Sequence, residues 1–318
     1  MKTYTIENNY LKIVAVSFGA ALQQVITKDK NGKDINVIIS YQNLEDYKNN
    51  ALHLGATAGR FAGRIHKNGF VLNGEKYTLA NNNNGVHLHG GTEGFGLKEW
   101  ELESMEKGEN PSITFSYLSK DMEEAYPGEL RVLCTYQLQN NKLIISYKAT
   151  STKDTIVNLT NHNYYNLDGK GSILNHEMQI NAEKFLEKDN YNVANGNFKD
   201  VADTFYNFRE STKIKDHKDF NGLDDCYVLT EKEPAIIIHS PESGIEMKVS
   251  TNQPGVVVYT PKEMEADKYT NTPLQKYPSI CFETQNFPDA PNNDHFPSAV
   301  LKKGDTYINK STFEFNLR

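Results

Sequence analysis

The feature that most constrains the fold is an alternation of apolar and polar residues with a period of two, repeated along the whole chain. Its clearest stretch puts these residues on one face: Leu130, Val132, Cys134, Tyr136 and Leu138. Successive side chains of a β-strand point to opposite faces of a sheet, so this spacing is that of a strand with one buried face. No window of about 11–18 residues has the 3.6-residue period of an amphipathic helix. The pattern predicts an all-β protein, built as a large antiparallel β-sandwich.

Other segments repeat the pattern between turn signals. We expect strands within residues 10–27 (broken at Gly19), 35–40, 69–79, 112–118, 143–147, 155–159, 235–239, 245–249, 256–259 and 280–283. Asn73-Gly74 separates two apolar runs and predicts a hairpin, because both central residues of a type I′ turn need positive φ. Residues 43–48 suit one or two helical turns, and residues 81–84 and 183–222 are expected to be long loops. No linker or repeat divides the chain, so we expect one domain over residues 1–318.

Composition narrows the classes of partner. The net charge is −7 and no block of basic residues occurs, which argues against nucleic acid and anionic membrane surfaces. No apolar run approaches the ~18 residues of a membrane span, and the N-terminal residues have no apolar core of a signal peptide. The cysteines Cys134, Cys226 and Cys281 are widely separated, without metal-ligand spacing. We therefore expect a cytoplasmic protein with reduced thiols that acts on a neutral small molecule.

A lone carboxylate, Glu283, lies where an expected strand gives way to a loop containing Pro288 and Pro291. Proline cannot donate to a sheet ladder, so the strand should end near this point. Such junctions commonly display functional side chains, because a rigid strand aims the residue and the loop leaves room for a ligand. The alternative is a solvated glutamate on an edge strand.

Two other segments carry charged groups suited to a polar ligand. Arg60 and Arg64 lie in a glycine-bounded stretch, and arginine offers a fork of donors to carboxylates, phosphates or vicinal hydroxyls. Asp224 and Asp225 precede an expected strand, where a carboxylate can accept hydrogen bonds from sugar hydroxyls. The plainer interpretations are two surface arginines and a turn cap.

Histidines mark two further segments. His87 and His89 would point to the same side of a strand and could form a metal pair, but no third ligand has suitable local spacing, so we predict no metal. His162 lies at the centre of a run rich in asparagine at residues 157–167. Amides and hydroxyls around an imidazole can hold the ring in one tautomer, although asparagines also cap ordinary turns.

Taken together, these segments resemble the aldose 1-epimerase (galactose mutarotase) family. In the order of that family, the matching stretches are GRFAGRI (59–65), HLHGG (87–91), TNHNYYNL (160–167), GLDD (222–225) and ETQNFPDAPN (283–292). EAYPG (124–128) and QPG (253–255) add weaker similarities. The resemblance extends from about Leu11 to about Tyr307. It implies a single β-sandwich of the galactose mutarotase type, in which these segments meet in one cleft.

The resemblance implies an isomerase that interconverts the α and β anomers of a free aldohexose, such as galactose or glucose, without a cofactor. Opening a pyranose needs a base at the C1 hydroxyl and an acid at the ring oxygen. The family resemblance would make Glu283 the base and His162 the acid, with His89 beside the ring oxygen. Arg64 and Asp224 would bind sugar hydroxyls. A working carboxylate base should be partly desolvated, and a histidine acid must be protonated, so we expect each group to support the other's charged form.

The chain departs from the family pattern in several places. Gly63 stands where the family usually has Asn, which removes an amide beside Arg64. Asp225 replaces a frequent His and would add negative charge at the pocket rim. Asn286 replaces another frequent His, and residues 203–209 lack the family's proline. None of these changes affects the proposed acid or base, so they concern substrate preference. His87 matches a variable position and is interpreted as structural.

Three other functions remain open from the residues. A glycosidase would need a carboxylic acid partner for Glu283, and Asp224 is the only obvious candidate. A non-catalytic sugar-binding sandwich would bind sugar even after Glu283→Gln, and its parent protein would accelerate no reaction. A relative acting on hexose phosphates would need cationic side chains beyond Arg60 and Arg64.

Trp100 could stack on a sugar face, but on a strand it is more often a core residue.

Overall fold

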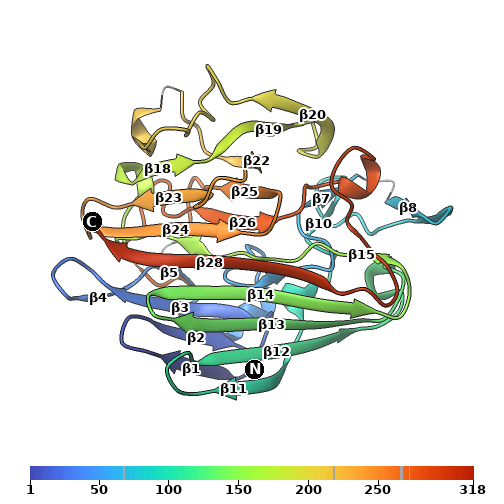
Figure 1. Ribbon diagram of the computed structural model, residues 1–318, viewed down its shortest axis with the longest axis horizontal. Helices are drawn as coiled ribbons and strands as arrows, with labels where there is room; N and C mark the ends of the chain where they lie inside the picture. The colour runs from blue at the N-terminus through green and yellow to red at the C-terminus, as the bar shows by residue number, and fades with distance from the viewer. Residues whose placement is uncertain (67–68, 218, 266–267, 272) are drawn as a thin grey trace.

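The structure is a computed structural model that describes residues 1–66, 69–217, 219–265, 268–271 and 273–318. Its largest sheet has nine strands in the order β11 (Glu101–Glu106), β12 (Ser112–Ser119), β13 (Leu130–Gln139), β14 (Lys142–Ser151), β28 (Tyr307–Leu317), β24 (Ile245–Thr251), β23 (Ile236–His239), β18 (Glu177–Ile180) and β21 (Thr212–Lys213). In Figure 1 this sheet runs from β11 at the bottom to β18 near the top. All its strand pairs are antiparallel.

Two smaller sheets accompany it. A five-stranded sheet has the order β20 (Ala194–Asp200), β19 (Ala182–Lys188), β22 (Asp224–Leu229), β25 (Gly255–Tyr259) and β26 (Cys281–Gln285). A four-stranded sheet has the order β1 (Thr3–Glu7), β2 (Lys12–Val16), β3 (Ala21–Lys28) and β4 (Asp34–Asn36). Helical structure in the described residues is limited to short 3-10 turns at Leu44–Asn49, Phe95–Leu97, Glu123–Ala125, Ile173–Asn175, Ile214–Asp216 and Ala290–Asn292. The prediction of helical turns at residues 43–48 is confirmed.

Short two-stranded ladders connect these sheets. They pair β5 (Ile38–Ile39) with β17 (Tyr164–Tyr165), β6 (Thr57–Ala58) with β16 (Thr160–Asn161), β7 (Arg64–Ile65) with β10 (His87–Leu88), β8 (Phe70–Leu72) with β9 (Glu75–Tyr77), and β15 (Thr155–Ile156) with β27 (Val300–Leu301). The β8–β9 pair is the hairpin that Asn73-Gly74 predicted, and both turn residues have positive φ. The β5–β17, β6–β16 and β15–β27 ladders each pair segments more than 100 residues apart, so sequence-distant motifs can meet.

The main core lies between the nine-stranded sheet and the two smaller sheets. All five residues of the apolar face predicted on β13 are fully buried in it. Ile13 and Leu22 reach this core from the four-stranded sheet, and Val256 and Phe282 reach it from the five-stranded sheet. Because one core is shared by facing sheets, the predicted all-β sandwich is confirmed. No helix in the described ranges is long and apolar enough to cross a membrane.

The prediction of a long loop over residues 183–222 is wrong. β19 and β20 pair as a hairpin within it, and β21 adds an edge strand to the large sheet. Most of β20 is exposed, so its sequence lacks the alternation of a half-buried strand. In Figure 1 the β19–β20 hairpin lies beyond β18, at one end of the molecule.

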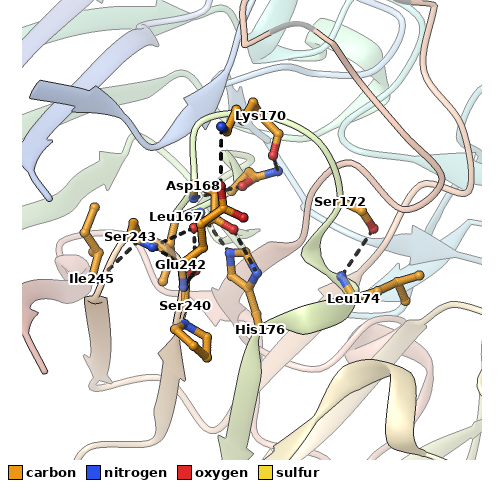
Figure 2. Close-up of polar contacts among 12 residues, drawn as sticks. Leu167, Asp168, Lys170, Ser172, Leu174, His176, Ser240, Glu242, Ser243 and Ile245 are labelled. Carbon is orange, nitrogen blue, oxygen red and sulfur yellow. Dashed lines mark hydrogen bonds and ion pairs between the residues drawn. The ribbon is translucent and has the colours of Figure 1, made fainter. Parts of the chain in front are cut away.

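A buried polar cluster fixes the chain between β17 and β18 (Figure 2). The backbone N–H of Leu167 donates to Nε2 of His176 at 3.1 Å, and Nδ1 of His176 lies 3.9 Å from a carboxylate oxygen of Asp168. The hydroxyl of Ser240 donates to the other oxygen of Asp168. Burial lowers the pKa of His176 to about 4, so the ring is neutral and its accepting Nε2 requires the proton on Nδ1. The cluster holds the segment that follows Tyr165 against β23.

The sandwich predicts a difference between two isoleucines on neighbouring strands. Ile145 on β14 is 2% exposed, and Ile308 on β28 is 56% exposed. We expect Ile145→Ala to lower the free energy of unfolding by about 2–5 kcal/mol, because it leaves a cavity in the core. The matched change Ile308→Ala should cost less than about 1 kcal/mol. Chemical denaturation measures both values, and equal losses would contradict the described core.

Candidate active site

The five side chains singled out in the sequence line one cavity. Arg64, His89, His162, Asp224 and Glu283 all contribute to its walls, and its volume is about 270 Å³. Small-molecule sites usually enclose roughly 300–1,000 Å³, so this cavity suits one small ligand. Its lining joins β7, β22, β26 and the segments that follow β10 and β16.

Glu283 lies at the centre of β26, opposite Val257 of β25. The sequence placed it at the end of its strand, but β26 continues to Gln285 because its ladder with β25 extends that far. Glu283 is 2% exposed, which excludes the solvated edge-strand alternative. Burial raises its pKa to about 8, with a further rise from Asp224 and an opposing effect of Arg64. The carboxyl group is therefore mostly protonated at pH 7 in the free protein.

His162 lies between β16 and β17, and its backbone is fixed on both sides. Its N–H donates to the carbonyl of Ala56, and its carbonyl accepts from the N–H of Gly55. Its ring stacks on Tyr164 at a centroid distance of 5.1 Å. Nε2 lies 3.4 Å from Oε1 of Glu283, while Nδ1 is buried without a hydrogen-bond partner. This geometry directs Nε2 toward the carboxyl group.

Burial sets the protonation of the pair formed by Glu283 and His162. It lowers the pKa of His162 to about 3, with a smaller contribution from His53. Both groups are therefore neutral near pH 7, and together they hold one proton. The prediction that each supports the other's charged form is wrong for the free protein, because loss of solvation is the largest cause of both pKa shifts and disfavours both charged forms.

His89 follows β10 and has a positive φ of 49°. The backbone N–H of Gly63 donates to its Nδ1 at 3.2 Å, so Nε2 carries the proton in the neutral ring. Its ring centroid is 5.4 Å from that of His162. Nitrogen and oxygen atoms of His89, His162 and Glu283 lie within 4.8 Å of one another, a spacing that could accept a metal ion. The His87–His89 pair that the sequence suggested as metal ligands does not form this site, because the His87 ring contacts Ala80 and Tyr126 instead.

Arg64 and Asp224 form a second polar wall. Nη1 of Arg64 lies 3.3 Å from a carboxylate oxygen of Asp224, and both side chains are partly exposed to the cavity. The pair joins β7 to the first residue of β22. Each group therefore retains free hydrogen-bonding positions for a polar ligand while its charge is balanced.

Other residues from the sequence motifs are structural. The buried guanidinium of Arg60 donates to the carbonyls of Pro127 and Gly128, so the EAYPG segment holds it away from the cavity. His87 contacts the hydroxyl of Tyr126 at 2.7 Å and is buried, as its structural interpretation predicted. Trp100 is a core residue whose Nε1 donates to the carbonyl of Phe95.

The departures from the family pattern have local explanations. Asp225 is 3% exposed and lies 2.8 Å from Nζ of Lys188, so it adds no free charge at the pocket rim. Asn286 donates to the carbonyls of Pro297 and Ser298 and does not line the cavity. Gly63 has a φ of +81°, which favours glycine, and its N–H positions His89.

The sequence analysis did not predict several of the residues that line the cavity. Among them are His53, Tyr164, Lys188, Cys226 and Tyr259. Tyr164 belongs to the TNHNYYNL stretch, so that motif could have pointed to it. Cys226 directly follows the GLDD stretch. His53, Lys188 and Tyr259 are isolated residues in ordinary strand or loop sequence, and only the folded chain brings them to the cavity.

Comparison with known proteins shows which family this chain belongs to. The family model described as aldose 1-epimerase matches residues 2–314. The galactose mutarotase of Sus scrofa is 35% identical over 100% of this chain and 94% of its own length. The aldose 1-epimerase of Haemophilus influenzae is 33% identical over 86% of this chain and 83% of its own length.

Solved structures of similar proteins agree with this family assignment. The aldose epimerase homologue from C. elegans superimposes with a TM-score of 0.92 at 30% identity and covers 99% of both chains. The galactose 1-epimerase of Lactobacillus acidophilus superimposes with a TM-score of 0.89 at 27% identity, covering 99% of this chain and 94% of that one. The chain therefore belongs to the aldose 1-epimerase family and is an isomerase with mutarotase activity.

The raised pKa of Glu283 predicts how stability changes with pH. Between its ordinary pKa of 4.5 and about 8, the unfolded chain releases this proton while the folded chain keeps it, so raising the pH favours unfolding. Glu283→Gln removes the ionisable carboxyl group and with it this loss of stability at higher pH. Its stability relative to the parent should rise by a few kcal/mol from pH 5 to pH 8.

Denaturant titrations of both proteins at the two pH values measure this change. His162 affects stability in the opposite direction, because its contribution is lost as the pH falls from 6.5 toward 3. This effect is present in both the parent and Glu283→Gln. Glu246→Gln, which changes a glutamate on β24 outside the cavity, is the matched control. A pH-independent difference between Glu283→Gln and the parent would contradict the burial argument.

Proposed function

We propose that this protein interconverts the α and β anomers of free aldohexoses, with galactose and glucose as substrates. The observation that carries the proposal is the buried contact of 3.4 Å between Glu283 and His162, in a cavity of about 270 Å³. The names of two relatives, a galactose mutarotase and an aldose 1-epimerase, support the substrate class. The reaction needs one base and one acid and no cofactor.

Glu283 is proposed as the base at the C1 hydroxyl and His162 as the acid at the ring oxygen. Glu283 accepts the C1 hydroxyl proton, His162 gives a proton to O5, and the C1–O5 bond breaks to leave an open aldehyde. Rotation about C1–C2 turns the other face of the carbonyl toward the O5 hydroxyl. Recyclisation then returns the proton from Glu283 to O1 and the O5 proton to His162, so the enzyme is regenerated.

The protonation of the free protein suits this cycle. After ring opening, Glu283 is protonated and His162 is neutral, which is the state that burial favours. For ring opening, the single proton must lie on His162 instead. We propose that the bound sugar stabilises this second arrangement, in which the C1 hydroxyl donates to the carboxylate and O5 accepts from the imidazolium. The pair therefore needs no net exchange of protons with solvent.

The remaining polar side chains are proposed to orient the sugar. Nε2–H of His89 can donate beside O5, and the free positions of Arg64 and Asp224 can bind hydroxyls. The two cations in the cavity lining, Arg64 and Lys188, each have an aspartate partner, which favours a neutral sugar over a sugar phosphate. Asp224 already contacts Arg64 at 3.3 Å, so it is not free to serve as the acid partner of Glu283 in a glycosidase.

We further propose that the protein is cytoplasmic and that residues 1–318 form one domain. Three free, buried cysteines support the first point, since reducing compartments preserve thiols. The family match over residues 2–314 and the core shared by the sheets support the second. A small sugar is the partner that this cavity suits, and neither nucleic acid nor membrane is proposed.

Replacing either member of the central pair should abolish most catalysis. We expect Glu283→Gln and His162→Gln each to lower kcat by about 10²–10⁴-fold, the usual contribution of general acid–base catalysis. Polarimetry of freshly dissolved α-D-galactose and α-D-glucose measures the approach to equilibrium rotation. Sugar binding measured by calorimetry should persist, because Arg64, His89 and Asp224 remain.

Two controls sharpen this test. Glu246→Gln should keep the parent rate, and dialysis of the parent against EDTA should leave the rate unchanged because no metal takes part. No acceleration by the parent protein with either sugar would contradict the proposed substrates. A full rate in Glu283→Gln would contradict the role of this carboxylate.

A further inference from the structure

His53 is a cavity residue that the proposed mechanism does not use. It lies between the 3-10 helix at residues 44–49 and β6, with a positive φ of 53°. Its ring centroid is 4.7 Å from that of His89 and 6.0 Å from that of His162. Three imidazoles therefore line the same cavity beside Glu283.

The His53 ring forms no hydrogen bond with the described part of the chain. Burial lowers its pKa to about 4, so the imidazole is neutral near pH 7 and has one donor and one acceptor nitrogen. His53 is half-buried, so a ligand that covers the ring must supply hydrogen-bond partners for its nitrogens. A sugar hydroxyl is a matching partner, because it both donates and accepts.

The surroundings of His89 strengthen this assignment. Gly63 lines the cavity and donates its backbone N–H to Nδ1 of His89, but it has no side chain to offer a ligand. His53 contacts the same His89 ring and brings a hydrogen-bonding side chain to the cavity. Arg64 and Lys188, the two cations in the cavity lining, are partly occupied by their aspartate partners.

We propose that His53 is a further substrate-binding residue, whose imidazole forms a hydrogen bond with one hydroxyl of the bound sugar. The proposal rests on the proposed function and adds a specificity-determining contact to it. The competing explanation is that His53 only fills space against His89 and His162. An aromatic ring without nitrogens would then serve equally well.

His53→Phe separates these explanations because it keeps a ring and removes both nitrogens. Anomer exchange measured by NMR at equilibrium gives kcat and KM for galactose and for its 2-, 3-, 4- and 6-deoxy analogues. We expect His53→Phe to raise KM for galactose about 3–10-fold, the loss of one neutral hydrogen bond, with a smaller change in kcat. For one deoxy analogue, which lacks the partner hydroxyl, parent and variant should have the same kcat/KM.

His295→Phe is the matched control, since His295 is exposed and does not line the cavity, and it should behave as the parent does. An unchanged KM in His53→Phe, or an equal penalty for all five sugars, would overturn the proposal. His53→Gln, which restores a donor and an acceptor, should recover part of the loss.

Failure of the proposed function would be visible separately. A parent protein that accelerates exchange of no sugar would refute the mutarotase assignment for these substrates. Calorimetry with galactose and the same analogues then tests His53 alone. Weaker binding by His53→Phe that disappears for one analogue supports the proposal, and equal binding or no binding by the parent overturns it.

Discussion

The candidate active site is built around a carboxyl group that is buried beside an imidazole. Glu283 and His162 are almost completely removed from water, and each charged form is disfavoured there. The pair avoids this cost by holding a single proton, which leaves both groups neutral. Mutarotation requires that one proton move between two oxygens of the sugar. We propose that a pair holding one titratable proton is suited to that task, because solvent then has neither to supply nor to remove it.

The antiparallel sandwich holds this pair in place through contacts between distant segments. The β25–β26 ladder fixes Glu283, and pairing of β6 with β16 and of β5 with β17 fixes both sides of His162. Polar groups are then added from separate ladders, with Arg64 on β7 and Asp224 on β22. A rigid two-sided frame limits the reorganisation that the reaction would otherwise require.

Sequence patterns predicted the features that depend on local chemistry. Alternation identified the buried face of β13, and the matched segments identified the five side chains that meet in the cavity. Features that depend on tertiary contacts were missed. β20 is mostly exposed and does not alternate, and the partner of Asp225 is Lys188, which is 37 residues earlier. The protonation of Glu283 also could not be predicted, since the extent of its burial is a property of the folded chain.

The most direct test of the shared proton is the dependence of kcat/KM on pH, corrected for spontaneous mutarotation. This ratio reports the ionisations of the free enzyme. The single-proton state should extend from about pH 3 to about pH 8, so kcat/KM should be level through neutral pH and fall above about pH 8. If the two groups instead kept their ordinary pKa values of 4.5 and 6.5, kcat/KM would fall above about pH 6.5. A decline that begins there would contradict the account.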